Sequence, residues 1–129
     1  MSRLPKPVQT SKAPAAIGPY SQAIVAGGMV YLSGQLGIDP KTGVIAENFA
    51  VQARQAMENL KAVVEAAGSN LELVVSVDVY LLDMGRFSQF NEIYASYFQE
   101  HRPARAAIAA RALPREAQVE VRCIAALPG

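Results

Sequence analysis

The sequence contains little of what several functional classes require. Only one of its 129 residues is cysteine and only one is histidine, which excludes an internal disulfide framework and leaves no cluster of ligands for a metal ion. The formal net charge is +1 and the basic residues are scattered, so the sequence offers no basic stripe for nucleic acid and no polybasic patch for a membrane surface.

Long apolar runs are also missing. No segment approaches the roughly 20 consecutive apolar residues that span a bilayer, and residues 1–7 lack the apolar core of a secretory signal. We therefore expect no metal, no nucleic-acid partner and no membrane association. The single cysteine favours a reducing, cytoplasmic compartment.

Motifs for nucleotide binding or covalent catalysis are absent as well. The glycine-containing segments at 27–28 and 34–37 lack the spacing of a phosphate-binding loop, and no serine has the flanks of a nucleophile elbow. The thiol of Cys123 falls on the apolar side of an alternating segment, where a lone cysteine is usually inert core. Polar residues within apolar runs remain as the candidates for chemistry.

The chain does have enough apolar sequence for one core. Hydrophobic residues make up 51% of it, and 129 residues is the size of one domain. We expect a single domain over residues 1–129, with an irregular N-terminal arm at 1–17, where proline is frequent.

Two helices are predicted from the spacing of apolar residues. Such residues recur every three or four positions over 49–67, with Asn48 as the N-cap and Gly68 as the stop. A second helix is expected after Asp83. Its apolar face consists of Phe87, Phe90, Tyr94, Tyr97 and Phe98.

The remaining apolar segments are predicted to be strands. Two runs within 21–38 flank a Gly-Gly pair, as in a hairpin, and residues 73–82 alternate between apolar and polar. Two more strands, at 105–110 and 118–126, are joined by a turn that contains Pro114. The order β-β-α-β-α-β-β predicts an α+β domain with two helices packed on one face of a mixed sheet. The strands also supply apolar residues to the other face, so we expect a barrel-like oligomer core to cover it.

Arg105 and Glu120 lie inside the last two predicted strands. An arginine offers a planar fork of donors that matches a carboxylate, and a glutamate can orient or deprotonate a water molecule. Together they suggest a site for a carboxylate-bearing molecule that reacts with water. Pattern alone slightly favours a surface arginine at an edge strand, and it favours a solvated Glu120 that is paired with Arg122.

Four other polar or small residues are candidates for the same site. Asn91 lies at the edge of the apolar arc of the second helix, where a bond to nearby backbone and a functional role are about equally supported. Tyr20 follows a Gly-Pro pair, where packing is the usual role, and Ser33 precedes Gly34, where a serine usually shapes a turn. Gly34 permits close approach of a ligand to the backbone.

Four motifs in order resemble those of one family. Residues 18–23 read Gly-Pro-Tyr-Ser-Gln-Ala, residues 30–35 read Val-Tyr-Leu-Ser-Gly-Gln, and residues 90–94 read Phe-Asn-Glu-Ile-Tyr. The fourth motif combines Pro-Ala-Arg at 103–105 with Ile108, Arg111 and Leu113 and with Val-Glu at 119–120. Over residues 18–126 the chain thus resembles the Rid family, also called the YjgF family, of reactive intermediate deaminases.

The resemblance implies a homotrimer of the chorismate-mutase-like fold, with a central barrel and clefts between subunits. It implies hydrolysis of 2-imino acids, such as 2-aminoacrylate and its imine 2-iminopropanoate or 2-iminobutanoate, to 2-oxo acids and ammonia, with no cofactor. Arg105 then binds the substrate carboxylate and Glu120 positions the water. The same resemblance places Tyr20, Ser33, Gly34 and Asn91 along the pocket.

Two departures from the family pattern stand out. Ala107 occupies a position where some members have cysteine, which removes a thiol-assisted variant of the reaction. The approach at 100–103 is short, which affects one pocket wall. Two alternatives also remain for the function: a non-enzymatic regulator that binds small carboxylates, and an RNA-cleaving translation inhibitor, which the near-neutral charge disfavours.

Overall fold

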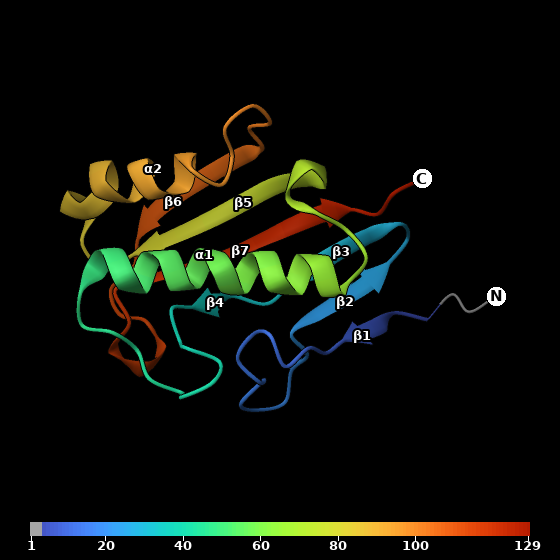
Figure 1. Ribbon diagram of the computed structural model, residues 1–129, viewed down its shortest axis with the longest axis horizontal. Helices are drawn as coiled ribbons and strands as arrows, with labels where there is room; N and C mark the ends of the chain where they lie inside the picture. Colours follow the sequence, from blue (N-terminus) through green and yellow to red (C-terminus); the bar gives the residue numbers. More distant parts are fainter. Residues whose placement is uncertain (1–3) are drawn as a thin grey trace.

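The computed structural model describes residues 4–129 and confirms the α+β class, with two helices on one face of a seven-stranded mixed sheet (Figure 1). The strands are β1 (Lys6–Val8), β2 (Ala23–Ala26), β3 (Met29–Leu32), β4 (Gln35–Leu36), β5 (Val74–Leu81), β6 (Ala104–Ala109) and β7 (Val119–Ala126). The helices are α1 (Phe49–Ala66) and α2 (Phe87–Ala95), with short 3-10 turns η1 (Leu71–Leu73), η2 (Met84–Arg86) and η3 (Pro114–Glu116).

The last strand occupies the middle of the sheet. The order is β1-β2-β3-β7-β5-β6, and β4 pairs with β7 beside β3. Within residues 4–129 only β5 and β6 run parallel, because α2 forms the crossover between them, whereas the other pairs are antiparallel. The sheet is therefore mixed, as predicted, and β6 is one of its edges (Figure 1).

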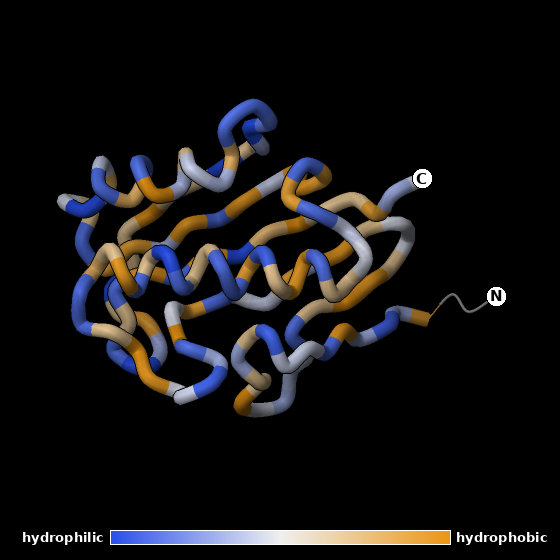
Figure 2. The backbone as a smooth tube through the Cα atoms, in the orientation of Figure 1, coloured by the Kyte–Doolittle hydropathy of each residue, from blue (hydrophilic) through white to orange (hydrophobic). Residues whose placement is uncertain are grey.

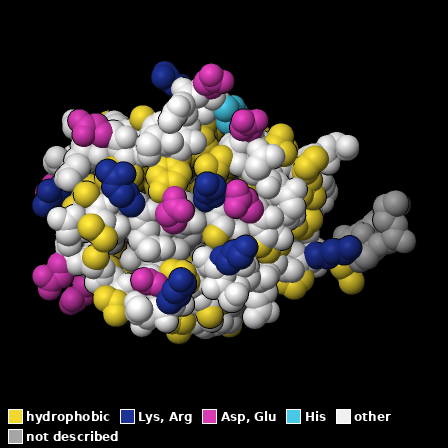
Figure 3. Space-filling view, in the orientation of Figure 1, with side chains coloured by type: hydrophobic (Ala, Val, Ile, Leu, Met, Phe, Trp, Pro, Cys, Tyr) yellow, Lys and Arg dark blue, Asp and Glu magenta, His cyan; other side chains and the backbone are white. Residues whose placement is uncertain are grey.

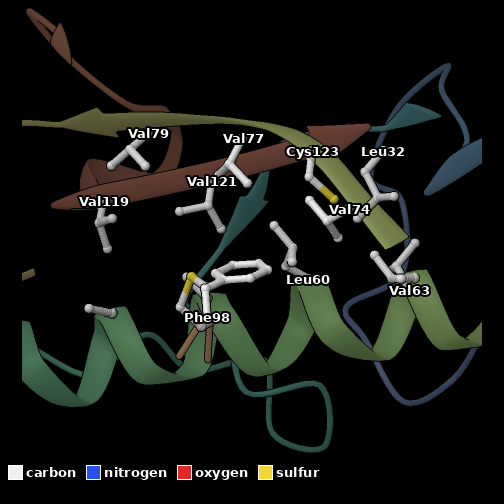
Figure 4. Close-up of a cluster of buried hydrophobic side chains, with 14 of the residues drawn as sticks. Leu32, Leu60, Val63, Val74, Val77, Val79, Phe98, Val119, Val121 and Cys123 are labelled. Carbon is white, nitrogen blue, oxygen red and sulfur yellow. The ribbon is translucent and has the colours of Figure 1, made fainter. Parts of the chain in front are cut away.

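The first helix begins and ends where the sequence predicts. The Asn48 side chain accepts a hydrogen bond from the Val51 amide at 3.0 Å, and Gly68 adopts φ 91°, which favours glycine. The apolar side of α1 packs on the sheet, where Leu60 and Val63 lie opposite valines of β5 and β7 (Figure 4). The hydropathy of the residues along the backbone agrees with this packing: α1 alternates between polar and apolar residues, while the central strands are mostly apolar (Figure 2).

The second helix is shorter than predicted. It was expected to carry Tyr97 and Phe98, but α2 ends at Ala95. The Ser96 hydroxyl donates to the Ile93 carbonyl at 2.6 Å, a local bond that competes with helix continuation. Phe98 is still buried in the core from the following turn (Figure 4).

The N-terminal arm is not wholly irregular, which corrects the expectation for residues 1–17. The chain forms β1 at Lys6–Val8, and Pro7 is tolerated there because β1 is an edge strand with one side free of ladder bonds. Ala13 is buried in the main core, so the arm is anchored further along as well. Residues 1–3 of the predicted arm lie outside the described residues. The two-residue strand β4 was not predicted either.

The two faces of the sheet differ. One is covered by α1 and α2, and the surface above them mixes charges of both signs (Figure 3). The other carries exposed apolar side chains, including Tyr31 on β3 and Ile108 on β6. We call this second side the open face. Among the described residues, no helix is long and apolar enough to cross a membrane.

Candidate functional site

A cavity of about 570 Å³ brings four of the predicted site residues together. Tyr20 comes from the arm, Ser33 and Gly34 from the link between β3 and β4, and Glu120 from β7. Apolar residues of the arm and of the segment after β4 line the rest of the wall. These residues meet because β4 pairs with β7 and places Leu36 opposite Glu120.

Gly34 makes room for the Glu120 carboxylate in the position that this side chain adopts. A Cβ atom on Gly34 would lie 2.8 Å from Cδ of Glu120, closer than real Cβ atoms come to other heavy atoms. The sequence suggested that Gly34 makes room for a ligand; in the structure the Glu120 side chain takes that room. Burial raises the pKa of Glu120, and the nearby Arg122 opposes the shift without cancelling it.

Glu120 has no ion-pair partner within residues 4–129. The expected pair with Arg122 does not form, because Nε of Arg122 lies 3.2 Å from Oδ2 of Asp78 on the neighbouring strand. That pair is partly exposed and contributes little stability. The Glu120 carboxylate is therefore partly desolvated and available to a water molecule or ligand in the cavity.

The two hydroxyl groups of the site are held by backbone. The Ser33 hydroxyl donates to the Ser21 carbonyl at 2.6 Å, which leaves its lone pairs free to accept. The Tyr20 hydroxyl accepts from the Ile17 amide at 3.4 Å, and its ring is about half exposed. Both side chains are thus fixed as parts of the wall.

Gln22 organises that wall, and sequence reasoning did not identify it as a separate contributor. Its side chain is only 3% exposed and bonds to the Thr10 amide (2.7 Å) and to the Thr10 (3.0 Å) and Pro14 (2.8 Å) carbonyls. A buried amide with this many backbone partners ties down the arm that borders the cavity. The residue lies in the 18–23 motif, but no periodicity marks it as buried.

Arg105 lies elsewhere, at the exposed edge strand β6, in contact with α2. Its Nη1 group donates to Oδ1 of Asn91 at 2.8 Å. The guanidinium carbon lies 4.7 Å from the ring centre of Tyr94 and 5.4 Å from that of Phe87. The amide of Asn91 thus bonds Arg105 and not nearby backbone, and two aromatic rings hold the guanidinium in place.

Arg105 and Glu120 are separated within one chain. Arg105 pairs with Val77 of β5, whose side chain is buried under the helices, whereas Glu120 pairs with Tyr80, on the open face. The strands β6 and β7 flank β5, so they are about 10 Å apart, and the two registers differ by three residues. One chain therefore does not bring the two predicted catalytic residues to one small molecule.

Two other residues qualify the sequence predictions. Cys123 points from β7 toward α1 (Figure 4), and burial raises the pKa of its thiol to about 12, so its predicted place in the core is confirmed. His101 follows α2 by several residues, and its Nε2 lies 2.6 Å from the Val74 carbonyl. Within residues 4–129 no three His, Cys, Asp or Glu side chains are grouped so that they could hold a metal ion.

Known proteins match nearly the whole length of this chain. The model of the family described as Endoribonuclease L-PSP matches residues 10–127. The 2-iminobutanoate/2-iminopropanoate deaminase of Salmonella typhimurium is 44% identical over 123 residues, which cover 93% of this chain and 96% of that protein.

Solved structures are similar as well. The Rid family protein YyfA from Yersinia pestis superposes with a TM-score of 0.94 at 40% identity, covering 96% of this chain and 100% of the other. E. coli TdcF with bound serine superposes with a TM-score of 0.92 at 37% identity, covering 95% and 99%.

Proposed function

The chain belongs to the Rid (YjgF) family, and we propose that it hydrolyses 2-imino acids, or their enamine tautomers, to 2-oxo acids and ammonia. The proposed substrates are 2-aminoacrylate with its imine 2-iminopropanoate, and 2-iminobutanoate. A relative named for deamination of the two imines, similar over nearly its whole length, supports this assignment. The observation that carries it is the fixed guanidinium of Arg105, set by Asn91 and two aromatic rings.

Arg105 is proposed to bind the substrate carboxylate. Asn91 accepts a hydrogen bond from Nη1 of Arg105. The remaining N–H groups of the guanidinium are free to form two hydrogen bonds with a carboxylate. The rings of Phe87 and Tyr94 restrict the plane of the guanidinium, so little side-chain freedom is lost on binding. The bound positive charge also withdraws electrons from the adjacent imine carbon.

Glu120 is proposed to hold the attacking water. Water adds to the imine carbon and forms the C–O bond, while a proton passes to the carboxylate. The imine nitrogen takes up this proton as the C=N π bond opens, which gives the carbinolamine and restores the carboxylate. The carbinolamine then loses ammonia as its hydroxyl proton passes to the leaving nitrogen, so the balance is imine plus water to oxo acid plus ammonia. Because the imine already hydrolyses slowly by itself, positioning of water and substrate supplies the acceleration without a nucleophilic side chain of the protein.

The two residues are proposed to meet between subunits of a homotrimer with the chorismate-mutase-like arrangement. Within one chain they lie on opposite sides of the sheet, so a second copy must supply one of them. The open face carries exposed Tyr31 and Ile108, and burial of these side chains would stabilise a closed assembly around a central barrel. Tyr20, Ser33 and Gly34 then line the cleft on the Glu120 side.

A carboxylate-binding regulator is the second candidate, because TdcF binds serine and Arg105 would serve binding alone equally well. Turnover separates the two. Imines would be generated in situ from several amino acids by an amino-acid oxidase, and the appearance of 2-oxo acid would be timed with and without the protein. Acceleration over the spontaneous rate supports the deaminase; 2-oxo acid binding without acceleration would leave only the regulator.

The family description also names an endoribonuclease, and the same preparation tests that activity. The formal net charge of +1 gives weak attraction to phosphates. We expect RNA cleavage, if detected, to disappear on repurification and to be unaffected by Arg105→Ala. Cleavage that persists through repurification and is lost in this variant would support the RNA-directed alternative.

A further inference from the structure

The turn η3 between β6 and β7 has an unusual backbone. Arg115 (φ 59°) and Glu116 (φ 55°) are the non-glycine residues with positive φ among residues 4–129. Residues other than glycine, asparagine and aspartate rarely adopt this backbone conformation. It persists only where the surrounding structure imposes it. A glycine or asparagine would form the same turn with less strain, so the turn itself does not explain an arginine at 115.

The turn places Arg115 on the wall of the Glu120 cavity. Pro114 and Arg115 line it together with Glu120 and Arg122. An Nη2 group of Arg115 donates to the Gly43 carbonyl at 3.1 Å, which fixes the guanidinium and leaves most of its donors unused. Arg122 is paired with Asp78, whereas no carboxylate within the described residues forms a salt bridge with Arg115.

One cation in the cavity wall is available to an anionic guest. Its charged lining residues are Arg115, Arg122 and Glu120, two cations and one anion. Asp78 compensates the charge of Arg122, so Arg115 is the lining cation without an ion-pair partner among the described residues. The volume of about 570 Å³ is ample for a small molecule with a side chain of two or three carbons.

We propose that Arg115 is a specificity-determining residue and that the preferred substrates are 2-imino acids whose side chain carries a second carboxylate. This inference rests on the proposed deaminase function. If Arg105 of one copy holds the α-carboxylate and Glu120 of another holds the water, the substrate side chain extends into the cavity that Arg115 borders. Arg115 then binds the distal carboxylate, while the apolar wall packs against the methylene groups.

The test compares two substrate classes on the same protein. Imines of the four- and five-carbon acidic amino acids and 2-iminobutanoate would be generated in situ, and kcat/KM measured for each. We expect a preference for the dicarboxylic imines. Arg115→Asn should lower the ratio of dicarboxylic to monocarboxylic kcat/KM about tenfold, since one charged contact is lost, and Arg115→Lys should restore part of it.

Thermal stability is the second readout. Asparagine tolerates positive φ, so Arg115→Asn should keep or raise the Tm while selectivity falls. The control Arg54→Ala, an exposed arginine on α1 away from the cavity, should change neither. A wild-type protein that prefers 2-iminobutanoate, or an unchanged ratio in Arg115→Asn, would overturn the proposal.

Binding separates a failure of this inference from a failure of the deaminase assignment. If no imine is hydrolysed, calorimetric titration with 2-oxoglutarate and 2-oxobutanoate still tests Arg115. Weaker binding of 2-oxoglutarate alone in Arg115→Asn supports the role of Arg115, and equal affinities in wild type and variant contradict it.

Discussion

Arg105 and Glu120 lie on opposite faces of one sheet, with the strand β5 between them. The arginine faces α2, where Asn91 and two aromatic rings hold it, and the glutamate faces a cavity on the open face. If both act on one substrate, as we propose, they must come from different copies of the chain. The arrangement of the sheet thus links the chemistry to assembly.

Assembly and shared sites can be tested together. Light scattering at micromolar concentration should return three times the chain mass of 13.8 kDa, because the apolar open face needs cover. Arg105→Ala and Glu120→Gln chains, each strongly impaired alone, should regain turnover when unfolded together and refolded, since mixed trimers contain some clefts with both native residues.

The control for this experiment mixes Arg105→Ala chains with chains that carry both substitutions, in which no cleft is complete. Turnover should not rise above that of Arg105→Ala alone. A monodisperse monomer, or a failure of the first mixture to recover activity despite mixed trimers, would refute the inter-subunit site.

Two substitutions of Arg105 should separate the contribution of its positive charge to carboxylate binding from that of its planar geometry. Arg105→Ala removes a two-bond contact to a carboxylate, and we expect a loss of about 3 kcal/mol in transition-state stabilisation, about 100-fold in kcat/KM. Arg105→Lys should recover only part, because an ammonium group does not reproduce the planar fork. Wild-type imine turnover and 2-oxo acid affinity in Arg105→Ala would show that the carboxylate binds elsewhere; Arg54→Ala is the matched control.

Glu120 should control the rate of imine hydrolysis and the fall of that rate at acidic pH. Glu120→Gln should keep 2-oxo acid binding and slow hydrolysis, because the amide does not accept a proton from water. Burial raises the pKa of Glu120, so the wild-type rate should fall with decreasing pH at a higher pH than for an ordinary glutamate. This acid limb should vanish in Glu120→Gln; its persistence would assign the titration to another group.

The same raised pKa has a consequence for stability. A carboxyl group whose folded pKa exceeds its unfolded pKa contributes stability below the unfolded value, and this contribution is lost as pH rises through the folded value. At neutral pH Glu120→Gln should therefore be at least as stable as wild type by urea unfolding. The difference in the free energy of unfolding between the two proteins should shrink as the pH is lowered. A less stable variant at neutral pH would contradict the desolvated environment of Glu120.

Gly34→Ala should act through Glu120. The added methyl group meets the Glu120 carboxylate and must displace it, while the Gly34 backbone needs no positive φ. We expect turnover to fall in a folded protein, and the same change in a Glu120→Gln background to add little further loss in rate. Additive losses in this double-mutant cycle would mean that Gly34 contacts the substrate independently of Glu120.

Cys123 should be dispensable for chemistry. Burial raises its thiol pKa to about 12, so alkylating reagents should modify it only after unfolding. Cys123→Ser buries a hydroxyl group and should cost about 1–3 kcal/mol of stability, with turnover per folded molecule nearly intact. Lost activity in a folded variant of unchanged assembly would show that the thiol has a role.

The sequence alone predicted those features that depend on neighbouring residues. The α1 boundaries at Asn48 and Gly68, the alternation of β5 and β7, and the buried Cys123 all follow from local spacing and caps. The four ordered motifs likewise identified the family. Where a local competitor went unnoticed, as with the Ser96 hydroxyl bond at the end of α2, the prediction extended too far.

Only the tertiary structure decided which side chains meet. Asn91 reaches Arg105 because α2 crosses from β5 to the adjacent strand β6, and Glu120 fills the space at Gly34 because β4 pairs with β7. Such contacts join segments that are far apart in the chain, and their geometry depends on strand order and register, which periodicity does not encode. For the same reason the separation of Arg105 from Glu120 became visible only once β5 was found between their strands.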